Sequence, residues 1–455
     1  MSDPLGAAAR HARAYLDGLA ERPVNARASV GEIAARLGGP LPERGTDPAQ
    51  VVDELAAAVE DGLVATPGPR YLGFVTGGAL PAALAADWLT SAWDQNAALA
   101  VMSPAAAAVE TVAARWLLEA LGLPAGAGVG VVTGGQMANF TCLAAARNAV
   151  LARAGWDVEA DGLQGAPAIR VVAGEQVHVA AVAAVRYLGL GAGRIVRVPA
   201  DDQGRMRAGE LGAALDDGPA IVLAQAGEVN TGAFDPLAEI VDVAHERGAW
   251  VHVDGAFGLW AAASPSLRHR LDGHERADSW AVDGHKWLNV PYDTGYAIVA
   301  DAAAHAAALG ASAAYLQTGG DREGFQWAPE ASRRARAFPT YAALRQLGRE
   351  GIAALVDGCC AHARTVAGAL RGEPGVEVLN DVVLNQVLVR VGDDDRRTRA
   401  AVAAVQGSGE AWLGATTFRG RDAMRVSVSG WRTTEADADR CARAIVSGCR
   451  VALRH

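Results

Sequence analysis

Between residues 70 and 300, short apolar runs alternate with longer amphipathic runs, and this alternation restricts the chain to few folds. The apolar runs lie at 128–132, 169–173, 195–198, 220–224 and 250–253, with further candidates at 279–282 and 295–300. Helical patterns begin near Gln136, His178, Met206 and Pro236. Strands that alternate with helices predict an α/β fold with a mostly parallel central sheet covered by helices.

The regions on either side of this alternation follow different patterns. In the first 70 residues apolar side chains recur three and four apart, as in Val51, Leu55, Val59 and Leu63, which predicts helices. Such a segment has too little core to stand alone, and we expect it to pack on the main body or on a partner subunit. We therefore expect the chain to divide into three regions: an N-terminal helical segment at 1–70, a large α/β domain at 71–335 and a smaller C-terminal α+β domain at 336–455.

The C-terminal region should contain long helices at 333–372, strands near 385–391 and 424–428, and a last helix from about Thr434. The charge run Asp393-Asp394-Asp395-Arg396-Arg397 is expected to be a solvated turn.

Composition excludes several classes of function. The formal net charge of −10 argues against a nucleic acid or an anionic membrane as the partner. No apolar run has the length and composition of a membrane span, and the start of the chain lacks a signal sequence, so a cytoplasmic location is expected. The five cysteines lack C-x-x-C spacing, which predicts reduced thiols and no metal site.

Lys286 is the only lysine among the 41 basic residues, and the other 40 are arginines. Arginine supplies positive charge equally well but cannot act as a nucleophile, whereas an amine can form a Schiff base with a carbonyl. A solvated surface charge would not need this exception. We therefore expect Lys286 to be catalytic, with chance survival of one lysine as the alternative.

An amine nucleophile needs an electrophilic carbonyl, and in folds of this kind the usual one is that of pyridoxal 5'-phosphate (PLP). Asp254 ends an apolar run, at the edge of the sheet where ligands of α/β proteins bind, and could hold the pyridine nitrogen of PLP. A turn or helix-cap role is the alternative for this residue.

Two further segments supply the remaining groups that PLP requires. Thr133-Gly134-Gly135-Gln136 follows a strand and opens a helix, and such a helix N-terminus can bind phosphate. His178 follows another strand and could stack on the ring. The alternatives are an ordinary glycine turn and a polar histidine at a helix start. No complete G-x-G-x-x-G motif is present near these strands, which argues against a dinucleotide enzyme.

The chain resembles the PLP-dependent group II amino-acid decarboxylases, the family of the aromatic amino-acid decarboxylases. The resemblance lies in four motifs that occur in the same order: the glycine cradle, His178, Val253-Asp254-Gly255-Ala256 and Asp283-Gly284-His285-Lys286-Trp287. The resemblance runs from about Pro69 to Thr434. It implies the PLP-dependent transferase fold type I and a homodimer with its sites at the subunit interface.

The resemblance also implies roles for individual residues. Lys286 would carry PLP, Asp254 would hold the ring nitrogen, and His178 would stack on the ring and take part in catalysis. Gly135, Gln136 and His285 would contribute to phosphate binding, and Ala256 would pack against the cofactor. Tyr315, in a loop after the lysine, would donate the proton to the product, which favours plain decarboxylation over aldehyde formation.

The substrate is less constrained than the reaction. Tyr71, Phe74 and Trp93 are candidates for the pocket wall, with ordinary core packing as the alternative, and they favour an aromatic or bulky apolar L-amino acid. Asp283 and Asn230 depart from the family pattern, and their roles stay open. Other PLP reactions, namely aldehyde synthesis, retro-aldol cleavage and elimination, remain alternatives, as does a cofactor-free binding protein.

Overall fold

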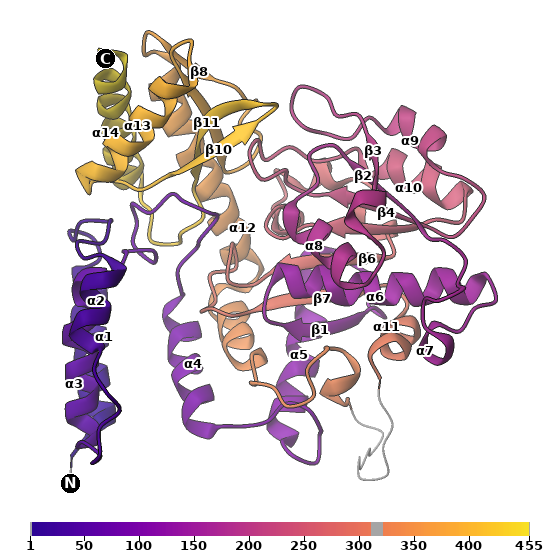
Figure 1. Ribbon diagram of the computed structural model, residues 1–455, viewed down its shortest axis with the longest axis horizontal. Coiled ribbons are helices and arrows are strands. Elements are labelled where there is room, and N and C mark those ends of the chain that lie inside the picture. Colours follow the sequence, from indigo (N-terminus) through magenta and orange to yellow (C-terminus); the bar gives the residue numbers. More distant parts are fainter. Residues whose placement is uncertain (1, 311–321, 455) are drawn as a thin grey trace.

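The computed structural model describes residues 2–310 and 322–454 of the 455-residue chain. A large α/β body carries a smaller C-terminal layer of strands and helices, and the N-terminal helices stand along one side (Figure 1). Tyr315 lies outside the described residues. Within the described part of the chain, no helix is long and apolar enough to cross a membrane.

The large sheet has seven strands in the order β1-β7-β6-β5-β4-β2-β3. Its strands are β1 (Gly128–Val132), β2 (Arg170–Gly174), β3 (Val196–Val198), β4 (Ala220–Gln225), β5 (Trp250–Asp254), β6 (Ser279–Asp283) and β7 (Gly295–Val299). Only β7 runs antiparallel to its neighbours within this sheet. The expected mostly parallel α/β sheet is therefore confirmed. Its strands could be identified because a strand buried on both faces is a nearly continuous apolar run.

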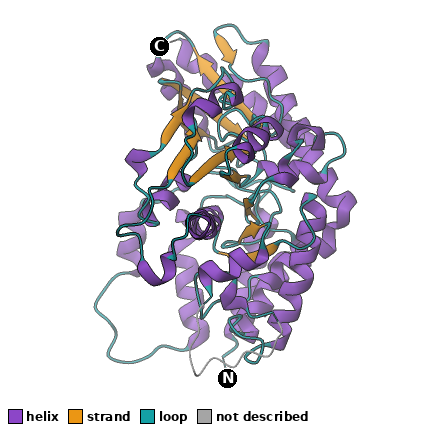
Figure 2. Ribbon diagram, turned by 90° about the vertical axis from the view of Figure 1, so that its right-hand side faces the viewer, coloured by secondary structure: helices purple, strands orange, loops and turns teal. Residues whose placement is uncertain are grey.

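Helices cover both faces of this sheet (Figure 2). One face packs on α6 (Gly135–Arg153), α8 (Val179–Tyr187) and α11 (Ala302–Leu309). The other face packs on α5 (Pro104–Leu121), α9 (Ala208–Ala214), α10 (Leu237–Glu246) and α12 (Ala337–Arg371). A short helix, α7 (Val158–Asp161), follows α6. Each face buries its own cluster of apolar side chains, which fixes the positions of the strand ends.

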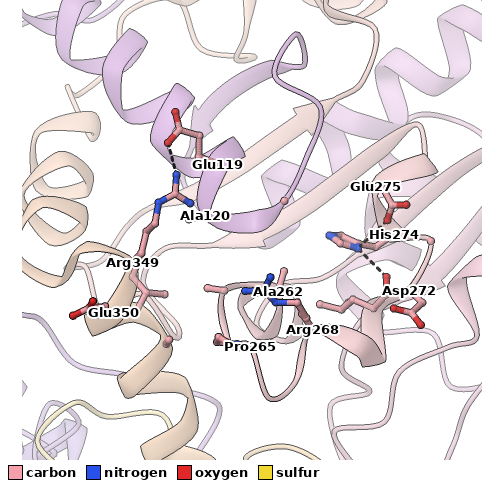
Figure 3. Close-up of a pocket in the computed structure, with 16 residues that line it drawn as sticks. Glu119, Ala120, Ala262, Pro265, Arg268, Asp272, His274, Glu275, Arg349 and Glu350 are labelled. Atoms are coloured by element: carbon pink, nitrogen blue, oxygen red, sulfur yellow. Dashed lines mark hydrogen bonds and ion pairs between the residues drawn. The ribbon is translucent and has the colours of Figure 1, made fainter.

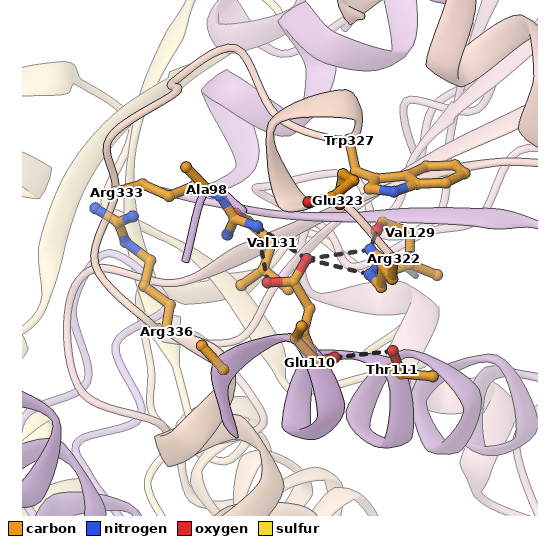
Figure 4. A network of polar contacts seen from close by, with 12 residues as sticks. Ala98, Glu110, Thr111, Val129, Val131, Arg322, Glu323, Trp327, Arg333 and Arg336 are labelled. Atoms are coloured by element: carbon orange, nitrogen blue, oxygen red, sulfur yellow. Dashed lines mark hydrogen bonds and ion pairs between the residues drawn. The ribbon is translucent and has the colours of Figure 1, made fainter. Parts of the chain in front are cut away.

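The outer edge of the large sheet is closed by a buried ion cluster (Figure 4). Glu110 on α5 pairs with Arg333 at 2.8 Å and with Arg322 at 3.1 Å. The two guanidinium groups also donate to the backbone carbonyls of Val129 and Val131 on edge strand β1. An unpaired sheet edge would otherwise leave these carbonyls without donors.

The C-terminal region forms a separate four-stranded antiparallel sheet in the order β10-β11-β9-β8. It comprises β8 (Val376–Val378), β9 (Gln386–Val391), β10 (Gly414–Phe418) and β11 (Arg421–Ser427), with α13 (Asp395–Ser408) and α14 (Glu435–Leu453) beside it. This matches the expected small α+β unit. The charge run at 393–397 is more than a turn, because Asp394 caps α13 and the helix begins at Asp395.

The N-terminal segment contains α1 (Pro4–Gly18), α2 (Val30–Leu37) and α3 (Pro48–Val59), and α4 (Pro81–Trp93) follows it. The expected apolar stripe on α3 is present but faces outward, since Val51 and Leu55 are about half exposed. The stripe therefore does not pack on the main body of this chain.

Candidate active site

Four segments that are distant in sequence meet at the carboxyl ends of the strands. Asp254 ends β5 and Asp283 ends β6, while α6 begins at Gly135 directly after β1 and His178 precedes α8 after β2. Parallel strands bring their carboxyl ends to one edge of the sheet, and ligands of α/β proteins bind there.

Lys286 extends from the turn after β6 and pairs with Asp283. Its Nζ lies 2.9 Å from Oδ2 of Asp283. Burial alone would lower the pKa of Lys286, but the negative charges of Asp283 and, more weakly, Asp254 outweigh burial and raise this pKa. Asp283 therefore holds a proton on the amine, and its carboxylate is placed to receive that proton.

The start of α6 forms the predicted anion cradle. Gly134 has a φ of +152°, and a Cβ there would come within 2.8 Å of the His285 ring. The N-cap residue, Gly134, has no side chain that could bind the first amides of this helix. One of them is already engaged, because Gly135 N donates to Oδ1 of Asp283 at 2.5 Å. Asp283 thus binds both the cradle and the lysine, which gives a structural role to a residue left open by the sequence.

Asp254 is buried, with 6% of its surface exposed. Its Oδ2 accepts from Nδ2 of Asn139 at 3.2 Å, and its Oδ1 accepts from the amide of Ala256 at 3.2 Å. Ala256, the small residue expected beside the cofactor, is the partly exposed residue in the turn between Asp254 and the buried Phe257. Both carboxylate oxygens are therefore held in a fixed orientation.

His178 has the helix-start role that one of its two sequence interpretations gave, and its stacking on the cofactor ring stays a prediction. Its Nδ1 accepts from the amide of Ala180 at 3.2 Å, so it is the N-cap of α8. Burial lowers the pKa of His178, while Asp254 acts to raise this pKa and Lys286 and Arg425 act to lower it. These interactions place the imidazole among the charged groups of the site.

The His285 ring is oriented by a hydrogen bond from a backbone amide and by contact with an aromatic ring. Its Nδ1 accepts from the amide of Thr294 at 3.1 Å, and burial lowers the pKa of the imidazole. The ring of Tyr292 lies 4.5 Å from that of His285, centroid to centroid. Tyr292, whose hydroxyl is 3.4 Å from Oγ1 of Thr76, was not predicted. A tyrosine after a Pro in a loop carries no signal that distinguishes it from an exposed aromatic residue.

Comparison with known proteins agrees with this geometry. Residues 34–391 match the family model of the pyridoxal-dependent decarboxylase conserved domain. The chain belongs to this family. It is 30% identical over 291 residues to the aromatic-L-amino-acid decarboxylase of Bacillus atrophaeus, a match that covers 63% of this chain and 58% of that relative. It is 30% identical over 414 residues to the L-2,4-diaminobutyrate decarboxylase of Rhizobium meliloti, covering 87% of this chain and 81% of the relative.

The fold of this decarboxylase also matches a solved structure, that of Oryza sativa TDC with PLP and tryptamine. The TM-score is 0.91 at 24% identity, over 98% of this chain and 97% of the other. The protein is a PLP-dependent amino-acid decarboxylase, and the residues around Lys286 fit the cofactor: an amine, a fixed carboxylate, an imidazole and a helix N-terminus.

The predicted pocket residues of the decarboxylase divide into two groups. Tyr71 stacks on Trp412 with the ring centroids 5.0 Å apart, and Phe74 lies 5.3 Å from the same Trp412. This segment passes close to Lys286, since a Cβ on Gly77 would lie 2.1 Å from the Lys286 carbonyl oxygen. Trp93 is the last residue of α4. It packs on Phe338 and is not part of this cluster.

Two other residues near the site were missed or left open by the sequence. Arg425 lies on β11, which also carries Arg421 and Asp422, and its charge lowers the pKa of His178. Asn230 is structural: its Nδ2 donates to Glu228 at 2.9 Å, and its Oδ1 accepts from Thr416 of β10 at 2.7 Å. It therefore joins the two domains.

The largest cavity described, of about 700 Å³, lies elsewhere, between α5, α12 and the 3-10 turns at 258–276 (Figure 3). Two of its charged residues, Glu119 and Arg349, pair with each other at 2.8 Å. Both ring nitrogens of His274 face carbonyl oxygens. Among the described residues, no cluster of His, Cys, Asp or Glu could hold a metal ion.

Proposed function

We propose that this decarboxylase removes the α-carboxylate of an L-amino acid with an aromatic or bulky apolar side chain and releases the amine and CO₂. The observation that carries the choice of substrate is the cluster of Tyr71, Phe74 and Trp412, which lies on the segment that reaches the Lys286 backbone at Gly77. Flat apolar surfaces favour aromatic side chains, which gain stacking energy in addition to burial.

The site residues are proposed to divide the work as follows. Lys286 would hold the cofactor through its amine, and Asp283 is placed to accept a proton from that amine. Asp254 holds the ring nitrogen, His178 lies against the ring, and Gly135, Gln136 and His285 bind the phosphate, with Ala256 leaving room for the ring. Bound PLP supplies an electron sink for the charge left when CO₂ departs.

Electrostatics support this division of roles. The N-terminus of α6 and the guanidinium of Arg425 provide positive potential for the phosphate and for the substrate carboxylate. Buried Asp254 provides the negative charge that stabilises a protonated ring nitrogen. Tyr315 is proposed to donate the proton to the product carbon as a general acid.

We further propose a homodimer with its sites near the interface. Exposed apolar residues on α3 and α4, such as Val51, Leu55, Trp88 and Leu89, form a surface that a second copy could cover. The five cysteines are free and buried, which suits a cytoplasmic location. Light scattering of the purified protein tests the dimer, and a monomer at micromolar concentration would contradict it.

Product analysis tests the proposed reaction. The PLP-loaded protein should be incubated with the protein amino acids, ornithine and 2,4-diaminobutyrate, and amine, CO₂, aldehyde and ammonia should be quantified. Amine and CO₂ in equal amounts from an aromatic amino acid are the expected result. Aldehyde with ammonia would favour an aldehyde synthase, and preference for diaminobutyrate would contradict the proposed substrate class.

A further inference from the structure

A chain of buried polar side chains lies behind Asp254, on the side away from solvent. Trp250, His252 and Asp254 alternate along β5, so all three point to the face of the sheet that α6 covers. Ser279 is the register partner of His252 on the neighbouring strand β6. Asn139 lies one turn into α6. His252, Ser279 and Asn139 are completely buried.

The contacts within this chain form a continuous path. Nε1 of Trp250 donates to Oγ of Ser279 at 2.9 Å, and the same Oγ lies 2.9 Å from Nδ1 of His252. Nε2 of His252 lies 2.7 Å from Oδ1 of Asn139, whose Nδ2 donates to Asp254 at 3.2 Å.

The chemistry of each group fixes the direction of every hydrogen bond. The Asn139 amide nitrogen faces two groups that can only accept, the Gly135 carbonyl at 2.8 Å and the Asp254 carboxylate. The Asn139 oxygen must therefore face His252, and Nε2 of His252 must carry a hydrogen. Burial lowers the pKa of His252 to about 4, so the ring is neutral and its Nδ1 accepts from the Ser279 hydroxyl. Trp250 can only donate, which starts the chain.

We propose that His252 and Asn139 are positioning residues that form a one-directional relay from Trp250 to Asp254. Every hydrogen in the relay points toward Asp254, so the residue meets the cofactor as a carboxylate of fixed orientation. This role rests on the proposed function, in which Asp254 holds the ring nitrogen. The helix that opens the phosphate cradle at Gly135 also holds Asp254 through Asn139, so both ends of the cofactor would be positioned by α6.

The direction of the relay can be tested without cofactor or activity. In ¹⁵N-histidine-labelled protein, the His252 signal is assigned by its loss in His252→Gln. We expect a neutral ring with the hydrogen on Nε2 at pH 7. A hydrogen on Nδ1, or a cationic ring at this pH, would overturn the proposal.

The effect on Asp254 is tested in the holoenzyme with Asn139→Leu and His252→Leu. We expect kcat to fall roughly 10- to 100-fold with KM within about twofold, the size typical of removing an outer partner of an active-site ligand. His252→Gln can still donate to Asn139 and should recover most of the rate. Thr141→Val is the matched control, because Thr141 is buried on the same helix and its hydroxyl has no hydrogen-bond partner in the described structure.

Wild-type kcat in a folded, PLP-loaded Asn139→Leu variant would overturn the proposal. An equal loss in Thr141→Val would do the same, since it would reduce the effect to general packing of α6. A wild-type protein that binds no PLP would refute the proposed function, while the ¹⁵N measurement would still decide the direction of the relay.

Discussion

Oδ2 of Asp283 lies 2.9 Å from Nζ of Lys286, while Oδ1 of the same carboxylate accepts from the Gly135 amide at the start of α6. One carboxylate thus joins Lys286 to the first turn of α6, the proposed phosphate site. The arrangement keeps Lys286 protonated and places a negative charge where a phosphate would bind.

Replacing Asp283 by Asn should therefore strengthen PLP binding. The amide oxygen of Asn can still accept from Gly135, but the charge beside the phosphate is removed and the pKa of Lys286 should fall. We expect PLP affinity to rise about tenfold, roughly 1.4 kcal/mol, in an absorbance titration. Asp242→Asn on the exposed surface changes net charge equally and should leave affinity unchanged. Weaker binding by Asp283→Asn would show that the carboxylate is needed to position the lysine.

His252 should make the protein sensitive to acid. Burial lowers its pKa from 6.5 to about 4, so between these values the unfolded chain takes up a proton that the folded chain does not. Stability is therefore lost as the pH falls through this window, by roughly 2 kcal/mol between pH 7 and pH 5.

Urea unfolding of the wild type and of His252→Gln at both pH values isolates this contribution. Asp235, whose pKa burial raises to about 6, has the opposite pH dependence but is present in both proteins. A wild-type-minus-variant difference that does not change with pH would contradict the assignment of a neutral His252.

Glu110→Gln should destabilise the fold strongly. The substitution leaves Arg333 and Arg322 beside β1 without their counter-charge, and Arg333 has only 1% of its side chain exposed. Removing one partner of a buried pair costs about 3–5 kcal/mol. Glu119→Gln removes the exposed pair with Arg349 and should cost less than about 1 kcal/mol in the same denaturation experiment. Equal effects of the two variants would show that the cluster is not effectively buried.

Tyr292 and Tyr315, which both follow Lys286 in the sequence, should differ in their effect on the products. Tyr315→Phe should lower amine formation roughly 100-fold, as expected for loss of a general acid, and raise the share of aldehyde and ammonia. Tyr292→Phe keeps the ring against His285 and should still give amine. Mass spectrometry of the products distinguishes amine from aldehyde for each variant. If Tyr292→Phe formed aldehyde and Tyr315→Phe did not, the proton donor would be Tyr292 and not Tyr315.

Much of this architecture was predictable because its signals are local. Six of the seven strands of the large sheet are almost entirely buried and mostly apolar, and Asp254, His178 and Lys286 each lie at or after the end of such a strand. The short strands β8 and β10 were missed because they are only partly buried and lack that signal.

The remaining features depend on contacts between distant segments. Trp412 meets Tyr71, and Arg425 approaches His178, only after the C-terminal domain has packed on the large one. The direction of the hydrogen-bond relay behind Asp254 could be inferred only once the pairing of β5 with β6 and the position of α6 were known. No spacing within a single segment encodes these relationships.

The central claim is that Lys286 carries the cofactor, and borohydride reduction tests it most directly. Because Lys286 is the only lysine, the amine of the chain's N-terminus is the one competing site. Reduction of the PLP-loaded protein should fix one pyridoxyl group on the peptide that contains Lys286, and Lys286→Arg should show neither the adduct nor visible absorbance. An unmodified Lys286 peptide, or full activity in Lys286→Arg, would contradict the account.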